Sequence, residues 1–192
     1  MPDGSSLGAR IRSRVMRRSI VPLAALAAAL ACGGSIPESS DDSQDLAPPI
    51  ELVSAGVYRG RRPDQATLRN LKALGVRTVL DLENDNSVVA SEKKAVGALG
   101  MNFISEPMSG FWSPNDGEVN QIEAIMADAS RRPLFVHCQH GEDRTGLIVG
   151  LFRVFSQQWR PGDAYREMIA KGFHKALFLL NHYYEEKTGW ED

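Results

Sequence analysis

Apolar residues recur along residues 57–186 in two alternating patterns. Short apolar runs at 57–59, 76–82, 101–105 and 133–137 predict strands, and the apolar, β-branched run at 76–82 predicts a buried one. Apolar residues at helical spacing predict helices over 63–74, 88–99, 117–130, 145–155, 161–171 and 174–186. This alternation predicts an α/β fold with a central, mostly parallel sheet flanked by helices.

The first 49 residues do not continue this pattern. A stretch that ends in Arg17 and Arg18 precedes twelve small apolar residues at 20–31, too few to span a bilayer but typical of a secretory signal peptide over 1–31. Cys32 follows directly, in a setting that resembles a bacterial lipobox with its Leu one position closer than usual. Residues 32–49 are rich in Gly, Ser, Asp and Pro and predict a solvated tether, which leaves one domain over 50–192.

These features predict an exported protein, a periplasmic or cell-envelope lipoprotein of a bacterium, held at the membrane only by a lipid on Cys32. An uncleaved anchor or a misplaced start codon stays open as an alternative. The chain has only two cysteines, Cys32 and Cys138, so no disulfide framework is expected. A lone thiol in an oxidising compartment suggests a chemical role for Cys138.

Charge excludes one class of partner. The 192 residues carry a net charge of −2, but the first 31 hold five arginines and one aspartate, so the rest has 17 basic and 23 acidic residues. A body this acidic offers no broad basic surface for nucleic acid. Any anion must therefore be held by a small, focused site. As a separate expectation, we predict that the protein is a monomer.

The segment 134–146 predicts such a site. A strand ends at His137, a loop carries Cys138 at one end and Arg144 at the other, and a helix follows. The helix N-terminus offers unpaired N–H groups and a positive dipole end to a dianion. Gly141 lets the loop curl so that successive amides point inward, and Arg144 supplies a planar fork for two phosphate oxygens.

The same field favours the thiolate of Cys138, which can then attack phosphorus. Thr145 follows Arg144, where its hydroxyl could donate to the sulfur and ease its departure. We assign phosphate binding to the whole loop and its first helical residue: Gln139, His140, Gly141, Glu142, Asp143, Arg144 and Thr145. A zinc site at His137, Cys138 and His140 is disfavoured because no second ligand pair lies at usable spacing, so no metal or other cofactor is expected. His137 is expected to fix the loop by hydrogen bonding.

Cys138 and Arg144 separated by five residues, followed by Thr145-Gly146 and preceded by a strand ending in His, resemble the protein-tyrosine and dual-specificity phosphatase superfamily. Its atypical dual-specificity group of plants, fungi and bacteria is the most similar. Residues 57–63 and 68–82 also resemble segments of that group. The resemblance implies the superfamily's phosphotyrosine-phosphatase-like α/β fold and a cysteinyl-phosphate intermediate. It also implies a general acid, an Asp on a mobile loop before the nucleophile.

Asp116 is the acid that this resemblance favours, because it lies in a loop-like stretch 22 residues before Cys138. The alternative is structural: Ser113 as a helix N-cap with Asp116 as its reciprocal capping residue. Asp143, Glu118 and Asp85 are further candidates for the acid.

The predicted activity is hydrolysis of phosphate monoesters on a protein, a lipid or a small molecule. Glu142 and Asp143 would oppose a highly charged substrate unless they point outward, although His140, Lys171 and His174 could restore positive field. Two alternatives remain: a pseudo-phosphatase that binds phosphorylated ligands without turnover, and a sulfurtransferase of the rhodanese type. The Arg144-Thr145-Gly146 ending disfavours the second.

Overall fold

The structure is a computed structural model that describes residues 49–191. Its sheet has five strands in the order β1-β2-β5-β3-β4. The strands β2, β5, β3 and β4 are parallel, and β1 pairs antiparallel with β2 at one edge. The bounds are β1 Glu51–Ser54, β2 Val57–Arg61, β3 Thr78–Asp81, β4 Asn102–Ser105 and β5 Leu134–Cys138.

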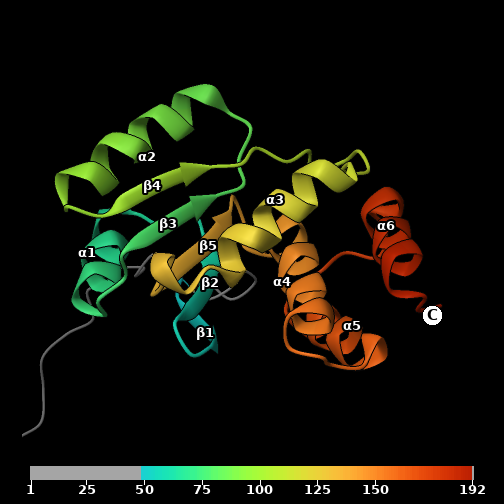
Figure 1. The fold of residues 1–192 in the computed structure, drawn as a ribbon. Helices are drawn as coiled ribbons and strands as arrows, with labels where there is room; N and C mark the ends of the chain where they lie inside the picture. Colours follow the sequence, from blue (N-terminus) through green and yellow to red (C-terminus); the bar gives the residue numbers. More distant parts are fainter. Residues whose placement is uncertain (1–48, 192) are drawn as a thin grey trace, which may run out of the picture. The chain divides into compact units, whose positions relative to one another are not determined.

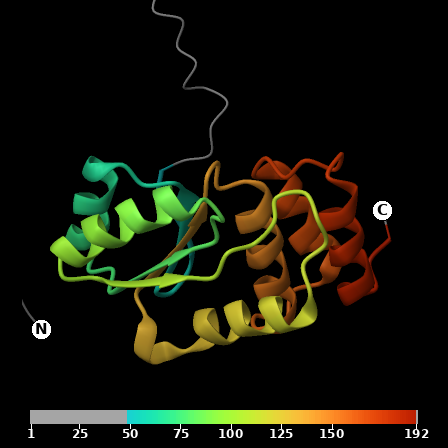
Figure 2. The ribbon, with the colours of Figure 1, turned by 90° about the horizontal axis from the view of Figure 1, so that it is seen from above.

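Helices cover both faces of this sheet (Figure 1), and the view from above separates the two groups (Figure 2). One face carries α1 (Gln65–Ala73) and α2 (Asn86–Ala98). The other carries α3 (Asp116–Ala127), α4 (Asp143–Phe155), α5 (Pro161–Ala170) and α6 (Phe178–Thr188). The predicted α/β class with a mostly parallel sheet is therefore confirmed.

Successive side chains of β5 point to opposite faces of the sheet, and so pack against different helices. Leu134, Val136 and Cys138 belong to the core shared with α3–α6, whereas Phe135 belongs to the core shared with α1 and α2. Successive side chains of a strand point to opposite faces, so His137 lies on the α1–α2 side and Cys138 on the α4 side. Because β5 pairs with β2 and β3 on its two sides, Cys138 emerges at the centre of the sheet edge where the parallel strands end.

Several predicted boundaries were wrong. The edge strand β1 was missed, since its four residues expose Leu52 and show no clear apolar alternation. The helix expected at 145 begins at Asp143, and the helix expected at 174 begins at Phe178 because the backbone of His174 is bound to Asp143 instead. The predicted cap at Ser113 is also wrong, because Asn115 is the N-cap of α3 and shares a capping box with Glu118.

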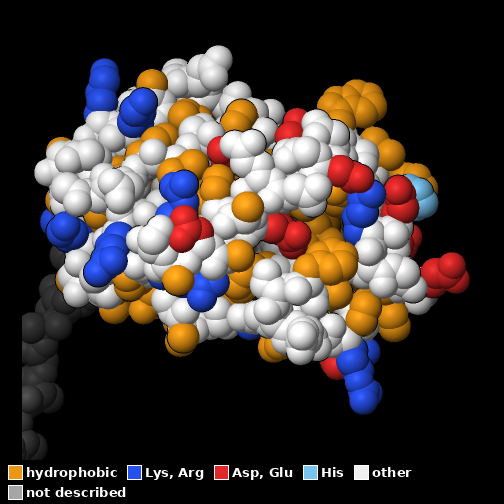
Figure 3. Space-filling model, viewed as in Figure 1, with side chains coloured by type: hydrophobic (Ala, Val, Ile, Leu, Met, Phe, Trp, Pro, Cys, Tyr) orange, Lys and Arg blue, Asp and Glu red, His pale blue; other side chains and the backbone are white. Residues whose placement is uncertain are grey.

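The surface mixes charges and apolar groups. On the face drawn in Figure 3, lysines and arginines are separated by acidic, polar and apolar side chains. Apolar side chains gather at the upper right of that view, over the segment between β4 and α3 and over α6. Among residues 49–191, no helix combines the length and the apolar character needed to cross a membrane.

Candidate active site

The loop between β5 and α4 turns sharply at Gly141. Its φ of +78° lies in the left-handed region, and a Cβ there would lie 2.5 Å from the backbone carbon and oxygen of Gly60 on β2. Both conditions require glycine, as the sequence predicted for the curl of the loop. The loop is thus pressed directly against the backbone of the neighbouring strand.

Two hydrogen bonds from the β2 side hold the loop in this curl. The buried Arg59 donates from Nη2 to the carbonyl oxygen of Gly141 at 2.7 Å, and the backbone N–H of Arg62 donates to the carbonyl oxygen of Gln139 at 3.2 Å. Desolvation by burial lowers the pKa of Arg59, against the charges of Glu51 and Glu167. Carbonyls that are bonded on the outside of the loop leave its amides to face inward, which is the arrangement an anion needs.

The first turn of α4 has no side-chain cap. Glu142 occupies the N-cap position but accepts no capping hydrogen bond, because its side chain packs against Gly172, where a Cβ would lie 2.8 Å from its Cγ. An uncapped helix start leaves N–H groups for an anion. Glu142 is also buried, so it does not oppose a substrate from within the loop as directly as its sequence position suggested.

Arg144 lies in the first turn of α4 and reaches across the strand ends. Its Nη1 donates to the carbonyl oxygen of Leu82 after β3 at 3.2 Å, and to that of Met108 after β4 at 3.5 Å. A guanidinium has five N–H donors, so these contacts fix its plane while leaving donors for phosphate oxygens.

A pocket of about 490 Å³ opens over this loop. Cys138, Gln139 and Arg144 line it. Its other lining residues are Asn84, Gly110, Phe111, His140, Asp143, His174, Ala176 and Leu177. The structure therefore brings five of the predicted site residues to one cavity: Cys138, Gln139, His140, Asp143 and Arg144.

Three residues assigned to phosphate binding, Gly141, Glu142 and Thr145, do not line this pocket, and Thr145 is fully buried. Its hydroxyl has no hydrogen-bond partner among the described residues, so the predicted donation to the Cys138 sulfur is not made in this structure. A buried hydroxyl without a partner is costly, which makes it available to a sulfur whose charge changes during a reaction.

Asp116 lies elsewhere. It is the first residue of α3, where it accepts hydrogen bonds from the Tyr183 hydroxyl at 3.1 Å and from Lys187 Nζ at 2.9 Å. These bonds to α6 lower the pKa of Asp116. It lines a separate pocket of about 190 Å³ that also contains Leu151 and Phe155, so its role as the acid stays a prediction that this conformation does not favour.

The other candidates for the acid have structural partners too. Asp85 caps α2 by accepting from the backbone N–H groups of Ser87 and Val88, and Glu118 completes the capping box of α3. Asp143 alone of these carboxylates lines the pocket that contains Cys138, and its Oδ1 lies 3.0 Å from His174 Nδ1. Lys171, by contrast, is ion-paired with Glu51. The predicted lipidation site Cys32 lies outside the described residues.

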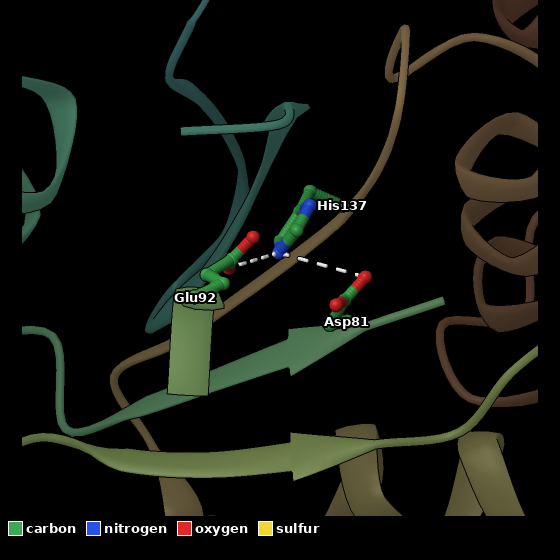
Figure 4. Close-up of side chains that lie close together, drawn as sticks. All are labelled: Asp81, Glu92 and His137. Carbon is green, nitrogen blue, oxygen red and sulfur yellow. Dashed lines mark ion pairs between the residues drawn. The ribbon is translucent and has the colours of Figure 1, made fainter. Parts of the chain in front are cut away.

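A buried trio behind the loop was not predicted from the sequence. Asp81 and His137 are register partners on β3 and β5, and Glu92 reaches them from α2 (Figure 4). His137 Nε2 lies 2.8 Å from Glu92 Oε1 and 4.0 Å from Asp81 Oδ1, and its ring stacks on Phe135. Burial raises the pKa of Asp81 to about 6, although the charge of His137 opposes this. A carboxylate inside the apolar run 76–82 was the signal that could have revealed the trio.

Among residues 49–191, two groups of three side chains could hold a cation: Asp81, Glu92 and His137, and also Glu142, Asp143 and His174. In the first group the 2.8 Å separation of nitrogen and oxygen is shorter than the roughly 3.4 Å expected between ligands of a tetrahedral zinc ion. An ion pair therefore suits that group better. In the second group, Asp143 and His174 line the pocket over Cys138, and their side chains contact each other there.

Comparisons with known proteins agree with this geometry. A family model described as "DSP-PTPase phosphatase fused to NAD+ Kinase" matches residues 36–178. The dual specificity protein phosphatase TpbA of Pseudomonas aeruginosa strain UCBPP-PA14 is 29% identical over 161 residues, which cover 79% of this chain and 71% of TpbA. The inositol diphosphatase DSP1 of Oryza sativa subsp. japonica is 29% identical over 122 residues, which cover 59% of this chain and about half, 53%, of the rice protein.

Solved structures share the fold. The crystal structure of P. aeruginosa TpbA superposes with a TM-score of 0.62 at 24% identity, over 75% of this chain and 91% of that one. The Siw14 catalytic core gives a TM-score of 0.63 at 22% identity, over 73% and 85%. The matched family model and the relatives in sequence show that the chain belongs to the DSP-PTPase phosphatases, cysteine-based enzymes, and that it hydrolyses phosphate monoesters.

Proposed function

We propose that this phosphatase acts on phosphate esters of aromatic alcohols, and foremost on phosphotyrosine in a protein. In this proposal the thiolate of Cys138 attacks phosphorus, the loop amides and Arg144 bind the phosphoryl oxygens, and no metal takes part. The observation that carries the substrate class is the apolar wall of the pocket. Phe111, Ala176 and Leu177 line the pocket together with Cys138.

An aromatic ring suits this opening. Phe111 is 76% exposed, so its ring is available to stack on a flat ligand at little cost in desolvation. The negative charge of Asp143 in the pocket lining works against a substrate that carries several further phosphates. A similar protein, TpbA, is named a dual specificity protein phosphatase, and one of its crystal structures is a complex with pTyr.

An inositol diphosphate is the second candidate, because the rice relative and several Arabidopsis relatives are named inositol diphosphatases. The two candidates differ in charge and in apolar surface, so one panel of substrates separates them. A phosphotyrosyl peptide, a phosphoseryl peptide and a diphosphoinositol phosphate are compared by kcat/KM at equal ionic strength.

We expect the phosphotyrosyl peptide to be preferred by at least about tenfold over the other two. Cys138→Ser removes the nucleophile and abolishes turnover of every substrate. Phe111→Ala does not alter the sequence of the phosphate-binding loop. It should therefore raise KM for the phosphotyrosyl peptide by a larger factor than it raises the inhibition constant of inorganic phosphate. A preference for the diphosphoinositol phosphate would overturn the proposed substrate class but not the phosphatase activity.

We also propose that the protein is exported, monomeric and anchored through a lipid on Cys32. The supporting observations are those of the sequence: the basic and apolar residues 1–31 and the cysteine that follows. Replacing Cys32 by Ser should release the protein from the membrane fraction of the host. Membrane association that persists in this variant would contradict the lipid anchor.

A further inference from the structure

Transfer of the phosphoryl group to Cys138 leaves an alkoxide or phenoxide that needs a proton. Asp116, predicted for this task, faces α6 in a different pocket. The pocket over Cys138 is lined by four other groups that carry or exchange protons, namely His140, Asp143, Arg144 and His174. Arg144 is assigned to binding the phosphoryl oxygens, and Asp143 already accepts from His174.

We propose that His174, oriented by Asp143, is the general acid and base of this phosphatase. The assignment rests on the proposed function, because it concerns the same pocket and reaction. A histidine would thus do the work that the sequence resemblance gave to an aspartate.

The geometry of the pair supports a fixed ring. Asp143 Oδ1 accepts the backbone N–H of His174 at 2.9 Å and lies 3.0 Å from its ring nitrogen Nδ1. The two contacts anchor both the backbone and the ring to α4, five residues after the nucleophile. With Nδ1–H donating to Asp143, the opposite nitrogen, Nε2, is the one left to exchange a proton with a ligand.

Electrostatics favour the protonated form of the ring. The hydrogen bond to Asp143, and next the charge of that carboxylate, raise the pKa of His174 above its usual 6.5, while desolvation opposes them weakly and Glu142 adds to them. Arg144 and His140 line the same pocket, and a positive charge on either side chain would lower the pKa of His174. The side chain of His174 is 62% exposed, so a bound substrate, and not the empty pocket, would exclude water from it.

The proposed steps balance. The Cys138 sulfur forms a bond to phosphorus while the bond from phosphorus to the leaving oxygen breaks, and that oxygen takes the proton from Nε2. Neutral Nε2 then accepts a proton from water, whose oxygen attacks phosphorus as the sulfur–phosphorus bond breaks. Inorganic phosphate leaves, and both the thiolate and the imidazolium are restored.

The test uses aryl and alkyl phosphates whose leaving groups differ in basicity, with single-turnover rates measured in the full-length protein. His174→Asn should lower the rate about 100-fold for a basic leaving group but less than about threefold for an acidic phenol, which departs without a proton. Asp143→Asn should move the alkaline limb of the kcat profile to lower pH. The matched control is His182→Asn, since His182 is an exposed histidine on α6 outside the pocket.

Three outcomes would overturn the assignment. The first is an equal loss on both kinds of substrate in His174→Asn, which indicates a binding or structural role. The second is no loss at all. The third is a leaving-group-dependent loss in Asp116→Asn with wild-type behaviour in His174→Asn. Wild-type protein inactive on every phosphate ester would instead contradict the proposed function itself.

Discussion

The guanidinium of Arg59 lies beneath the catalytic loop and donates a 2.7 Å hydrogen bond from Nη2 to the carbonyl oxygen of Gly141. Arg59 is 4% exposed, so the bond forms in a place where water cannot replace either partner. A strand residue 82 positions earlier in the chain therefore helps to set the curl of the loop. The shape of the phosphate-binding loop therefore depends on this hydrogen bond to β2.

We expect Arg59→Met to destabilise the protein and to lower its activity. Methionine fills part of the same space but leaves the Gly141 carbonyl without a donor, a loss of about 1–3 kcal/mol in the free energy of unfolding. The freed carbonyl can rotate inward and repel phosphate, so kcat/KM should fall by at least about tenfold. Urea denaturation and steady-state kinetics measure the two effects.

Arg69→Met, at an exposed position of α1, is the control for the loss of an arginine. The hydrogen bond from Arg59 to Gly141 does not involve Arg69, so it stays intact in this variant. If Arg59→Met binds inorganic phosphate as tightly as the wild type, the contact does not shape the loop.

Gly141→Ala tests the close approach of the loop to β2. The added Cβ would lie 2.5 Å from the Gly60 backbone, and alanine would have to adopt a φ of +78°. Because the obstacle is backbone, it cannot move aside cheaply, so we expect a loss of more than about 2 kcal/mol in stability and of at least 100-fold in kcat/KM.

Gly97→Ala is a matched control for this change. Gly97 lies inside α2, and no heavy atom lies within 4 Å of a Cβ built there. Alanine at this position in the last turn of α2 should therefore stabilise the protein slightly, by up to about 1 kcal/mol. Equal effects of the two substitutions on the melting temperature would contradict the proposed role of the Gly60–Gly141 contact.

The pH dependence of stability has a definite sign because of Glu123. Desolvation raises the pKa of this carboxyl on α3 from 4.5 to about 7, and its Oε1 is buried without a hydrogen-bond partner in the described part of the chain. The folded protein holds this proton between pH 4.5 and 7 while the unfolded chain releases it, so stability falls as the pH rises through that window. Burial acts on Asp81 in the same direction, with a pKa of about 6.

Glu123→Gln should therefore flatten the decline in the free energy of unfolding between pH 5 and pH 8. We expect the variant to gain about 1–2 kcal/mol over the wild type at pH 8 and little or nothing at pH 5, after allowance for partial solvation of the carboxylate. Denaturant titrations at both pH values measure the difference. Parallel curves for the two proteins would show that Glu123 ionises normally.

Local patterns predicted the loop well, whereas long-range contacts decided the rest. Cys138, Gly141 and Arg144 are close in sequence, so the strand, turn and helix that position them could be predicted from one segment. The position of Asp116 depends on Lys187 and Tyr183, about 70 residues later, and no local pattern carries that information. The cap at Asn115 in place of Ser113 is a smaller case of the same ambiguity between neighbouring polar residues.

The trio behind the loop gives the last prediction. Glu92 and His137 are 45 residues apart in sequence, yet Oε1 and Nε2 lie 2.8 Å apart with both side chains almost fully buried. Glu92→Ala removes the partner of a buried imidazole whose ring cannot reach water, so we expect a loss of about 3 kcal/mol in the free energy of unfolding. Glu92→Gln keeps the shape and an acceptor oxygen and should lose less.

Glu92→Ala should also slow the reaction, because His137 directly precedes the nucleophile Cys138 on the same strand. Well below the melting temperature, kcat of Glu92→Ala should fall by about tenfold or more, while Glu92→Gln retains most of it. Ser91→Ala, a change at the exposed neighbouring residue of α2, should alter stability by less than about 0.5 kcal/mol. If Glu92→Ala unfolds at the same urea concentration as Ser91→Ala, the ion pair does not hold α2 to the sheet, and an unchanged kcat would show that it does not position Cys138.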